Sequence, residues 1–355
     1  MFLAIKEILH NKTRYFLVVF TVFLISYMVF FLTSLAVGLA RGNRTAVDQW
    51  NAESVVVSSY SNKSLTVSNI PENSYKDYQN KDVVPLGQMT VVTKLKGSDK
   101  KVNTNIFGVN WNSFISPKLT VGRMPKNDKE VIADSKLGND NIKLNSRVKI
   151  NGSKDFYKVV GLTQDNSFFT VPIIFTDLNT FRTLKYGSDQ VKNISALVVR
   201  DETKIKKSGL SQITIPDLIN HIPGYTAQIM VFAFMIGAMI IITFLIIGIF
   251  MYIITIQKIS LYGVMRAQGI RTARIVAALF YQILILTALG AGLALVAIAL
   301  TQLGLPKTVP FYSNWPAYGL LTVAIMIMAR WHVVNAQSFE NRSVIRNRRG
   351  LKLCI

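Results

Sequence analysis

The feature that most constrains this chain is a set of three long runs without any charged residue. The runs comprise 26 residues from Tyr15 to Ala40, 30 from Ala227 to Ile256 and 31 from Ile275 to Leu305. About 20 predominantly apolar residues suffice for a helix to cross the hydrocarbon core of a bilayer. A secretory signal peptide has a shorter apolar core, of about 7–15 residues. Each run therefore predicts a transmembrane helix, which excludes an ordinary soluble domain. We place these helices at residues 15–40, 226–256 and 273–305.

A fourth apolar stretch begins at Trp315 and is interrupted by Arg330 after 15 residues. It is shorter than the roughly 20 residues that a full span needs. We therefore assign an incomplete fourth transmembrane helix to residues 315–336, preceded by an external loop at residues 306–314.

The distribution of charge predicts the orientation of the helices. The chain has 40 Lys and Arg against 19 Asp and Glu, and residues 41–225 hold 26 of the basic and 17 of the acidic residues. Basic residues precede the first run and also lie between the second and third runs. Cytoplasmic loops carry this excess of Lys and Arg, so the N-terminus is expected in the cytoplasm and residues 41–225 outside the cell. The basic surplus beside apolar runs favours membrane lipid, and not nucleic acid, as its partner.

Residues 1–14 are predicted to form an N-terminal helix in the membrane interface. Phe2, Ile5, Ile8 and Leu9 share one helical face in this segment, as in interfacial amphipathic helices. The alternative is a simple continuation of the first transmembrane helix.

Residues 41–225 have shorter apolar runs and more turn residues, which predicts an extracellular α+β domain. Arg147 to Leu162 is the clearest hairpin pattern, with two β-rich runs meeting at Asn151-Gly152, a dipeptide that type I′ turns favour. Short helices are expected at Asp177 to Leu184 and Ile215 to Ile222. The other predicted strands are Ser54 to Ser59, Met89 to Leu95, Lys101 to Val109, Val131 to Asp134 and Ala196 to Arg200.

Two features of this domain have alternative interpretations. Lys94, Lys96, Lys100 and Lys101 form its densest charge cluster, which either protects a strand edge from aggregation or attracts an anionic ligand or lipid headgroups. Phe168-Phe169 is either an exposed hydrophobic contact or part of the core.

Several classes of site are not expected in this sequence. The single cysteine, Cys354, cannot form an internal disulfide. The three histidines, His10, His221 and His332, do not have zinc-site spacing. The spacing of side chains in residues 41–225 does not indicate a nucleophile with a base and a third group that orients the base. We therefore predict no metal site, no catalytic residue and no intrinsic cofactor.

The segment between the second and third runs, residues 257–272, has the pattern of a short amphipathic helix. Ile259, Tyr262 and Met265 recur at i, i+3 and i+6, and Gly269 supplies a helix stop. From the residues alone, this segment is either a helix that contacts a partner or a basic collar that faces lipid.

The same segment resembles the signature of FtsX-like, MacB-type ABC transporter permeases, G-[IV]-[LM]-[KR]-A-x-G. The matching residues are Gly263, Val264, Met265, Arg266, Ala267 and Gly269. Leu261 occupies a position where many members have an acidic residue. The sequence is further similar to the haem-exporting members of that family over nearly the whole chain to about residue 329. That similarity is carried by Ala4-Ile-Lys-Glu-Ile, Gly38-Leu-Ala-Arg, Tyr157-Lys-Val-Val-Gly and Ile222-Pro-Gly-Tyr.

The resemblance implies a homodimeric permease subunit in a bacterial cell membrane, bound to two copies of a separate ATPase subunit. ATP would be bound and hydrolysed by that partner, in agreement with the lack of a G-x-x-x-x-G-K-[ST] loop in this sequence. The residues expected to couple the two subunits are Ile259, Leu261, Tyr262, Gly263, Val264, Met265, Arg266, Ala267 and Gly269.

The resemblance also implies export of haem or a similar amphipathic toxic compound. Haem is an apolar plate with two carboxylates, so basic, aromatic and Met side chains near the outer membrane surface are its candidate contacts. These are Arg41, Arg44, Tyr225, Met230 and Phe232. The alternative is a non-transporting mechanotransmitter that controls an extracellular cell-wall hydrolase, as FtsX does. Haem sensitivity on deletion would favour export, and defects in chain separation would favour the alternative.

Residues 337–355 form an atypical tail, in which the family's usual K-[IV]-D-P-x-x-A-I ending is absent. A reading frame shifted by one nucleotide from about Ala329 permits Lys-Ile-Asp-Pro-Leu-Phe-Ala-Ile and then a stop codon. We therefore hypothesise a frameshift product, which resequencing of the 3′ end would test. The alternative is a genuine basic tail on anionic lipid.

Overall fold

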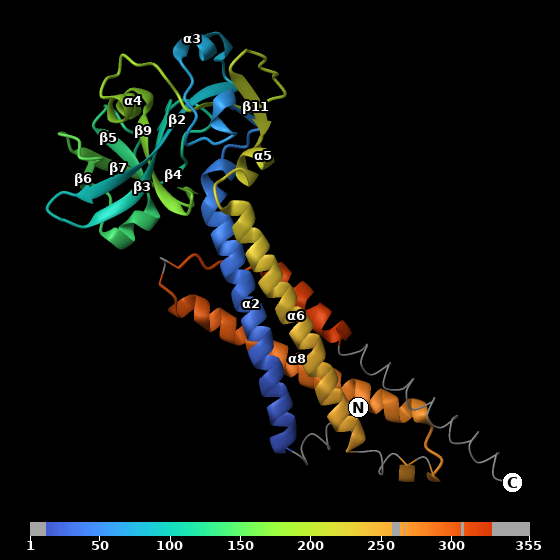
Figure 1. Cartoon of the computed structure of the whole chain (residues 1–355). Coiled ribbons are helices and arrows are strands. Elements are labelled where there is room, and N and C mark those ends of the chain that lie inside the picture. The colour runs from blue at the N-terminus through green and yellow to red at the C-terminus, as the bar shows by residue number, and fades with distance from the viewer. Residues whose placement is uncertain (1–11, 258–262, 266, 307–308, 329–355) are drawn as a thin grey trace. The chain divides into compact units, whose positions relative to one another are not determined.

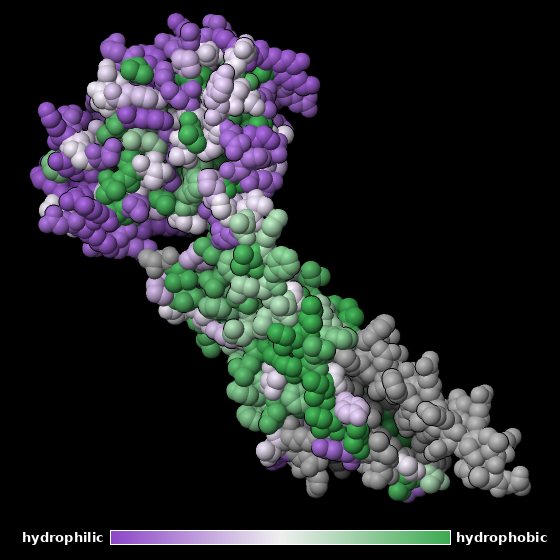
Figure 2. Space-filling model, in the orientation of Figure 1, coloured by the Kyte–Doolittle hydropathy of each residue, from purple (hydrophilic) through white to green (hydrophobic). Residues whose placement is uncertain are grey.

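The computed structural model describes residues 12–257, 263–265, 267–306 and 309–328 (Figure 1). The chain divides into two compact units. The membrane unit contains Met1–Val37, Met230–Leu305 and Phe311–Ile355, and the sheet domain contains Gly38–Ile229 with Pro306–Pro310. Figure 2 shows apolar side chains over the helices and hydrophilic side chains over much of the sheet domain.

Three helices in the described residues are long and apolar enough to cross a membrane. They lie in α2 (Lys12–Asp48), α6 (Tyr225–Ile256) and α8 (Thr272–Gly304). In lipid, every backbone polar group must be paired internally, which a continuous helix achieves. The three predicted spans are thus present as helices. However, α2 continues beyond Ala40 to Asp48.

The described part of the fourth apolar helix spans Trp315–Met328, and the described residues end there. This part is below the length of a full span, so a fourth transmembrane helix stays a prediction. The predicted interfacial helix at residues 1–14 lies almost entirely outside the described residues, as does the tail at residues 337–355.

Aromatic and hydroxyl side chains pack the membrane unit. Phe30 and Tyr318 are fully buried, with ring centroids 5.2 Å apart. The Tyr318 hydroxyl shares a hydrogen bond of 2.5 Å with Ser34 Oγ, and the Tyr27 hydroxyl shares one of 3.0 Å with Thr301 Oγ1. Hydrogen bonds between side chains help transmembrane helices to associate, because lipid supplies no hydrophobic driving force between them. These contacts join α2, α8 and the Trp315–Met328 helix.

A glycine allows close approach of α8 to α2. A Cβ atom at Gly290 would lie 2.8 Å from Val22 Cγ1 and 3.0 Å from the Val19 carbonyl oxygen. Small residues are the usual means by which transmembrane helices approach closely. We expect Gly290→Val to lower the melting temperature of the purified protein in detergent, because overpacking costs about 1–3 kcal/mol. Gly292→Val is the matched control on the same helix, since a Cβ there meets nothing within 4 Å. Equal melting temperatures for the two variants would contradict this packing.

Six strands of the sheet domain close into a barrel, because each strand pairs with the next and the last returns to the first. The ring starts with an antiparallel β2–β3 pair and closes with β6 on Thr93–Leu95 of β2. Val91, Ile106, Val148 and Ile174 are among the buried side chains of its core. In order around the ring, the strands are β2 (Val83–Leu95), β3 (Lys101–Val109), β9 (Val171–Asp177), β5 (Glu130–Asp134), β7 (Tyr157–Thr163) and β6 (Arg147–Ile150).

The first half of β2 also belongs to a four-stranded antiparallel sheet, in the order β11-β1-β10-β2. Successive side chains of a strand point to opposite faces. Val55 and Val57 of β1 thus enter one hydrophobic cluster and Val56 another. The other strands of this sheet are β1 (Ser54–Ser58), β10 (Ala196–Val199) and β11 (Leu210–Thr214). Two further strands pair outside it: β4 (Leu119–Gly122) is antiparallel to β7, and β8 (Ser167–Phe168) is antiparallel to β9.

Helices of the sheet domain follow their capping residues. Asp177 accepts hydrogen bonds from Asn179 and Thr180 N–H at the start of α4, and Thr214 accepts from Asp217 N–H at α5. The helical elements are α3 (Glu72–Tyr75), α4 (Leu178–Tyr186), α5 (Ile215–Asn220), η1 (Ser59–Ser61), η2 (Lys76–Tyr78) and η3 (Ser135–Asp140). Both predicted short helices are confirmed as α4 and α5.

The strand predictions for β1, β3, β5 and β10 are confirmed to within one residue at each end. For the predicted hairpin, the turn at Asn151-Gly152 is confirmed, but the prediction that two strands meet at this turn is wrong. Asn151 and Gly152 have φ of 49° and 71°, and Ser153 N–H donates to the Ile150 carbonyl, as in a type I′ turn. However, β7 starts only at Tyr157, so the two strands do not meet at this turn.

Candidate functional site

The last turns of α2 are embedded in the sheet domain. Ala46, Val47 and Trp50 are at most 3% exposed and belong to a large hydrophobic cluster there. Ala46 and Val47 lie in the last turn of α2, and Trp50 follows the helix in a turn in which its N–H donates to the Val47 carbonyl at 3.2 Å. The Trp50 ring lies 6.0 Å from the Phe107 ring of β3. The core of the sheet domain therefore holds the end of α2.

The segment from Gln164 to Thr170 grips the same end of α2 by hydrogen bonds. Thr45 Oγ1 donates to the Ser167 carbonyl and accepts from Ser167 N–H, at 3.3 and 3.0 Å. Phe169 and Thr170 N–H donate to the carbonyls of Asn43 and Gly42, at 3.3 and 3.0 Å. Gln49 Nε2 donates to two carbonyls of this segment, 3.2 and 2.8 Å away. We call residues 164–170 the α2 clamp.

Backbone strain is concentrated in the α2 clamp. Phe169 and Thr170 connect β8 to β9 with φ of 57° and 60°. Left-handed backbone costs a residue with a side chain roughly 1–2 kcal/mol, so the hydrogen bonds to α2 compensate an unfavourable turn. Phe168 is 1% exposed and Phe169 packs against the same cluster, which confirms the core interpretation of this pair.

Asp134 fixes the α2 clamp to the barrel. Its buried carboxylate accepts hydrogen bonds from Lys136 N–H at 2.8 Å and Asn166 N–H at 2.6 Å. Burial raises the pKa of the Asp134 carboxyl, and the two N–H donors oppose this increase. Lys136 Nζ also donates to Ser167 Oγ at 2.9 Å. This network positions the segment that holds α2.

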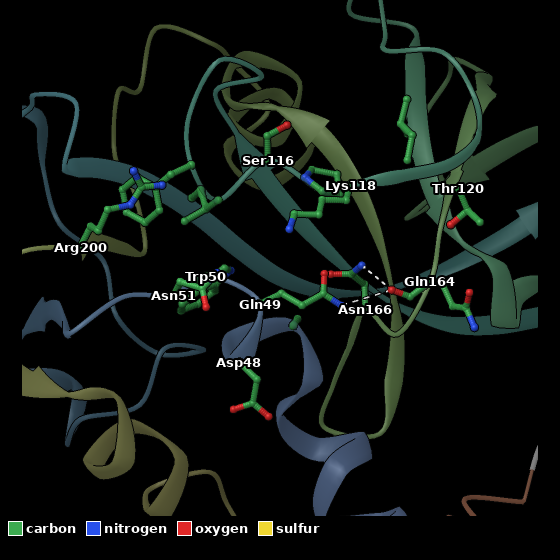
Figure 3. A pocket seen from close by; sticks show the side chains of 15 residues that line it. Asp48, Gln49, Trp50, Asn51, Ser116, Lys118, Thr120, Gln164, Asn166 and Arg200 are labelled. Carbon is green, nitrogen blue, oxygen red and sulfur yellow. Dashed lines mark hydrogen bonds between the residues drawn. The ribbon is translucent and has the colours of Figure 1, made fainter.

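A cleft of about 680 Å³ opens beside the end of α2 in the sheet domain (Figure 3). Gln49 and Asn166, which both donate to the Gln164 carbonyl, form one part of its wall. Lys118 and Arg200 bring two positive charges, and the Arg200 guanidinium lies 4.1 Å from the centre of the Phe114 ring. The other lining residues are Ala46, Asp48, Trp50, Asn51, Ile115, Ser116, Pro117, Leu119, Thr120 and Gln164.

The composition of this cleft suits an amphipathic anion. Two cations and several amides can pair with carboxylates, while the partly buried Phe114 offers apolar surface. Ser116 Oγ is buried without a hydrogen-bond partner in the described part of the chain. Sequence reasoning missed this cleft, because its lining comes from α2, the β3–β4 loop, the α2 clamp and the end of β10. No local motif joins these four segments.

The predicted substrate residues lie on α2 and α6. Arg44 is already engaged, since its guanidinium donates to the Asp48 carboxylate, with Nη2 2.7 Å from Oδ1. Through Asp48, Arg44 borders the cleft. Arg41 is exposed, and Tyr225 packs against the cluster that holds Trp50.

Met230 and Phe232 belong to the membrane unit, where Met230 is 57% exposed and Phe232 is half-buried. The five predicted substrate residues thus belong to both units, and their role as one site stays a prediction.

The predicted coupling helix is described only in part. Gly263, Val264 and Met265 are helical, and Ile259, Leu261, Tyr262 and Arg266 lie outside the described residues. Gly269 has φ of 84°, and Ile270 N–H donates to the Met265 carbonyl at 3.1 Å. This is the 6→1 bond of a Schellman motif, so the predicted glycine stop is confirmed. In the described residues, no three His, Cys, Asp or Glu side chains gather as a metal site.

Comparisons with known proteins identify similar chains. No protein-family model matches the sequence. It is 30% identical, over 92% of this chain and 93% of the relative, to a Staphylococcus epidermidis protein provisionally named hemin transport system permease protein HrtB. A protein of the same name from Staphylococcus haemolyticus is 28% identical, with the same coverage. An uncharacterized ABC transporter permease of Mycobacterium tuberculosis is 24% identical, again over 92% and 93% of the two chains.

Among solved structures, the extracellular domain of the noncanonic ABC-type transporter YknZ from Gram-positive bacteria is similar. The match has 14% sequence identity and a TM-score of 0.30, and covers 38% of this chain and 74% of that domain.

Proposed function

The chain belongs to the family of ABC transporter permeases that includes the hemin transport permeases HrtB, and from this premise we propose that it exports haem or a similarly amphipathic toxic compound. As the permease subunit of a bacterial ABC transporter, it is a membrane protein, depends on an ATPase partner and is not itself an enzyme. The observation that carries the proposal is the 30% identity to a relative named for hemin transport, over 92% of this chain.

The proposed assembly is a permease homodimer with two ATPase subunits, an N-terminus in the cytoplasm and lipid around the spans. ATP-driven movement would enter through the predicted coupling helix, around Gly263 to Gly269. It would then pass along α2, since α2 is one continuous helix from Lys12 to Asp48. Because the last turns of α2 are buried in the core of the sheet domain, that domain is expected to respond to movement of α2.

The proposed substrate route uses the residues around the outer end of α2. Arg41, Arg44, Tyr225, Met230 and Phe232 remain proposed haem contacts near the membrane. The cleft adds Lys118 and Arg200, whose charges fit the two carboxylates of haem. Phe114 beside these two cations supports the proposal, because a flat amphipathic anion needs both apolar and charged contacts.

Transport assays test this proposal. The permease and its ATPase are reconstituted in proteoliposomes, and ATP-dependent movement of hemin is measured. Lys118→Glu with Arg200→Glu should reduce hemin transport at low hemin concentration by about tenfold or more, because charged hydrogen bonds contribute about 1.5–3 kcal/mol each. Lys76→Glu with Lys206→Glu changes the charge equally at exposed sites outside the cleft. Absence of hemin transport by the wild-type complex would overturn the proposal.

A second candidate function is mechanical control of an extracellular cell-wall hydrolase. The observation in its favour is the α2 clamp, because a helix held by core packing and hydrogen bonds transmits force without any substrate. Deletion of the gene separates the two functions. Haem accumulation would support export, and chained cells with normal haem content would support control of a hydrolase.

A further inference from the structure

Three lysines lie side by side on the outside of the barrel. Lys94 of β2 is directly opposite Lys101 of β3 on one side and Lys149 of β6 on the other. The flanking residues of β6, Val148 and Ile150, are fully buried, so the alternation along the strand turns Lys149 outward. We call Lys94, Lys101 and Lys149 the lysine row.

The lysine row extends to two further basic residues. Arg147 lies two residues before Lys149 on the same face of β6, and it is directly opposite Lys158 of β7. Adjacent strands are about 4.8 Å apart, and alternate residues of one strand about 6.7 Å apart. Five cationic side chains therefore lie on four neighbouring strands of the barrel, β3, β2, β6 and β7. Figure 2 shows that the surface around the β2–β3 hairpin and β6 is strongly hydrophilic.

Edge protection does not explain this arrangement at Lys94. Lysines guard strands whose backbone groups lack a neighbour, whereas β2 is paired with β3 and β6 on both sides of Lys94. For Lys94, the edge interpretation of the sequence is therefore wrong. Like charges directly opposite each other in a sheet are destabilising, so the lysine row works against the stability of the barrel. A costly local arrangement of this kind points to a role outside folding.

Few acidic residues neutralise the lysine row and Arg147. Lys94 has one partner, the fully exposed Asp99, at 3.6 Å. Within the described part of the chain, Lys101, Lys149 and Arg147 form no ion pair. The row is thus a continuous source of positive potential on the barrel surface.

The residue types indicate what such a surface binds. Lysine is depleted in protein–protein interfaces, where aromatic residues, Met and Arg are enriched. A flat row of flexible ammonium groups fits a chain of repeated negative charges, since each Lys can pair with a phosphate as a point charge. Neutralisation of several phosphates at once also releases counterions, which favours a linear polymer over a single small anion.

We propose that the outer face of the barrel, centred on the lysine row, binds a linear phosphate-bearing polyanion. This binding surface is separate from the proposed export function, because none of its residues lines the cleft beside α2.

The test uses the full-length protein in nanodiscs of zwitterionic lipid and long-chain inorganic polyphosphate as the probe. The triple variant Lys94→Gln, Lys101→Gln, Lys149→Gln is expected to bind polyphosphate roughly 100-fold more weakly at low salt. The slope of log affinity against log salt should become less steep by about 2. Its melting temperature should equal or exceed that of the wild type, because repulsion within the row is relieved.

The matched control neutralises three exposed lysines elsewhere in the sheet domain, by Lys76→Gln, Lys81→Gln and Lys206→Gln. It has the same net charge as the triple variant and should bind polyphosphate much as the wild type does. Equal weakening of both variants, or no binding by the wild type, would overturn the proposal. If phosphatidylglycerol vesicles bound through the lysine row and polyphosphate did not bind, the assignment to a polymer would be overturned in favour of lipid headgroups.

Discussion

Gly87→Ala is expected to lower the free energy of unfolding of the sheet domain by about 3 kcal/mol, and its melting temperature by roughly 6–12 °C. Gly87 of β2 lies directly opposite Gly108 of β3, and the ring of Phe181 from α4 covers this glycine pair. A Cβ atom at Gly87 would lie 2.3 Å from Phe181 Cδ1. Phe181 is itself fully buried in the barrel core, so its ring cannot swing aside. Thermal unfolding of the purified full-length protein measures the effect.

The second part of this experiment identifies the clash as the cause. Gly138→Ala is the control, because a Cβ there meets nothing within 4 Å. Phe181→Ala alone should cost about 3–5 kcal/mol through lost packing. In the Phe181→Ala background, however, Gly87→Ala should cost little more, because contacting residues are not additive. The same melting temperature for Gly87→Ala and Gly138→Ala would show that the glycine pair is not required.

Much of the fold was predictable because its signals are local. An uncharged run such as Ala227 to Ile256 has one favourable structure in lipid, and α6 follows it closely. The β-rich run Lys101 to Val109 is observed as β3 with the predicted bounds. In contrast, β9 was missed because Pro172 near its start is unfavourable in a strand. β8 is two residues long and has no periodicity to detect.

Closure of the barrel was not predictable from local patterns. It depends on pairings such as β3 with β9, whose partners Asn105 and Ile173 lie far apart in the sequence. The position of Lys94 follows from the same pairings, since β2 gains a second neighbour only when β6 returns to it. The sequence shows Lys94 and Lys101 as part of a local cluster, but it does not show that Lys149 lies beside Lys94.

The candidate site was predictable only in part, for a related reason. The sequence points to the outer end of the first helix through Arg41 and Arg44, and the cleft does lie beside the end of α2. Lys118 and Arg200 carry no local signal, because they are two of the 26 basic residues spread over residues 41–225. Only the fold brings these two side chains beside α2.

Trp50→Ala is expected to have the largest functional effect, separating ATP hydrolysis from transport. Trp50 is 3% exposed and packs against Phe107 in the cluster that holds α2. Its truncation should cost about 3–5 kcal/mol, because it removes a large buried aromatic group and leaves a cavity. Because the core then holds the end of α2 less firmly, we expect the reconstituted complex to hydrolyse ATP while the proposed hemin transport falls at least tenfold.

The control for Trp50→Ala separates coupling from general instability. Trp111 is partly buried, packs against the same cluster and lies on the segment after β3 instead of at the end of α2. Trp111→Ala should therefore lower the melting temperature while transport per folded molecule is retained. Trp50→Phe keeps an aromatic ring in the cluster around the end of α2, and this variant should retain most of the transport that Trp50→Ala loses. If Trp50→Ala transported hemin as well as Trp111→Ala does, the end of α2 would not be the element that couples ATP hydrolysis to the sheet domain. The hydrogen bonds of the α2 clamp alone would then suffice to hold α2, because they join it to backbone atoms that neither substitution removes.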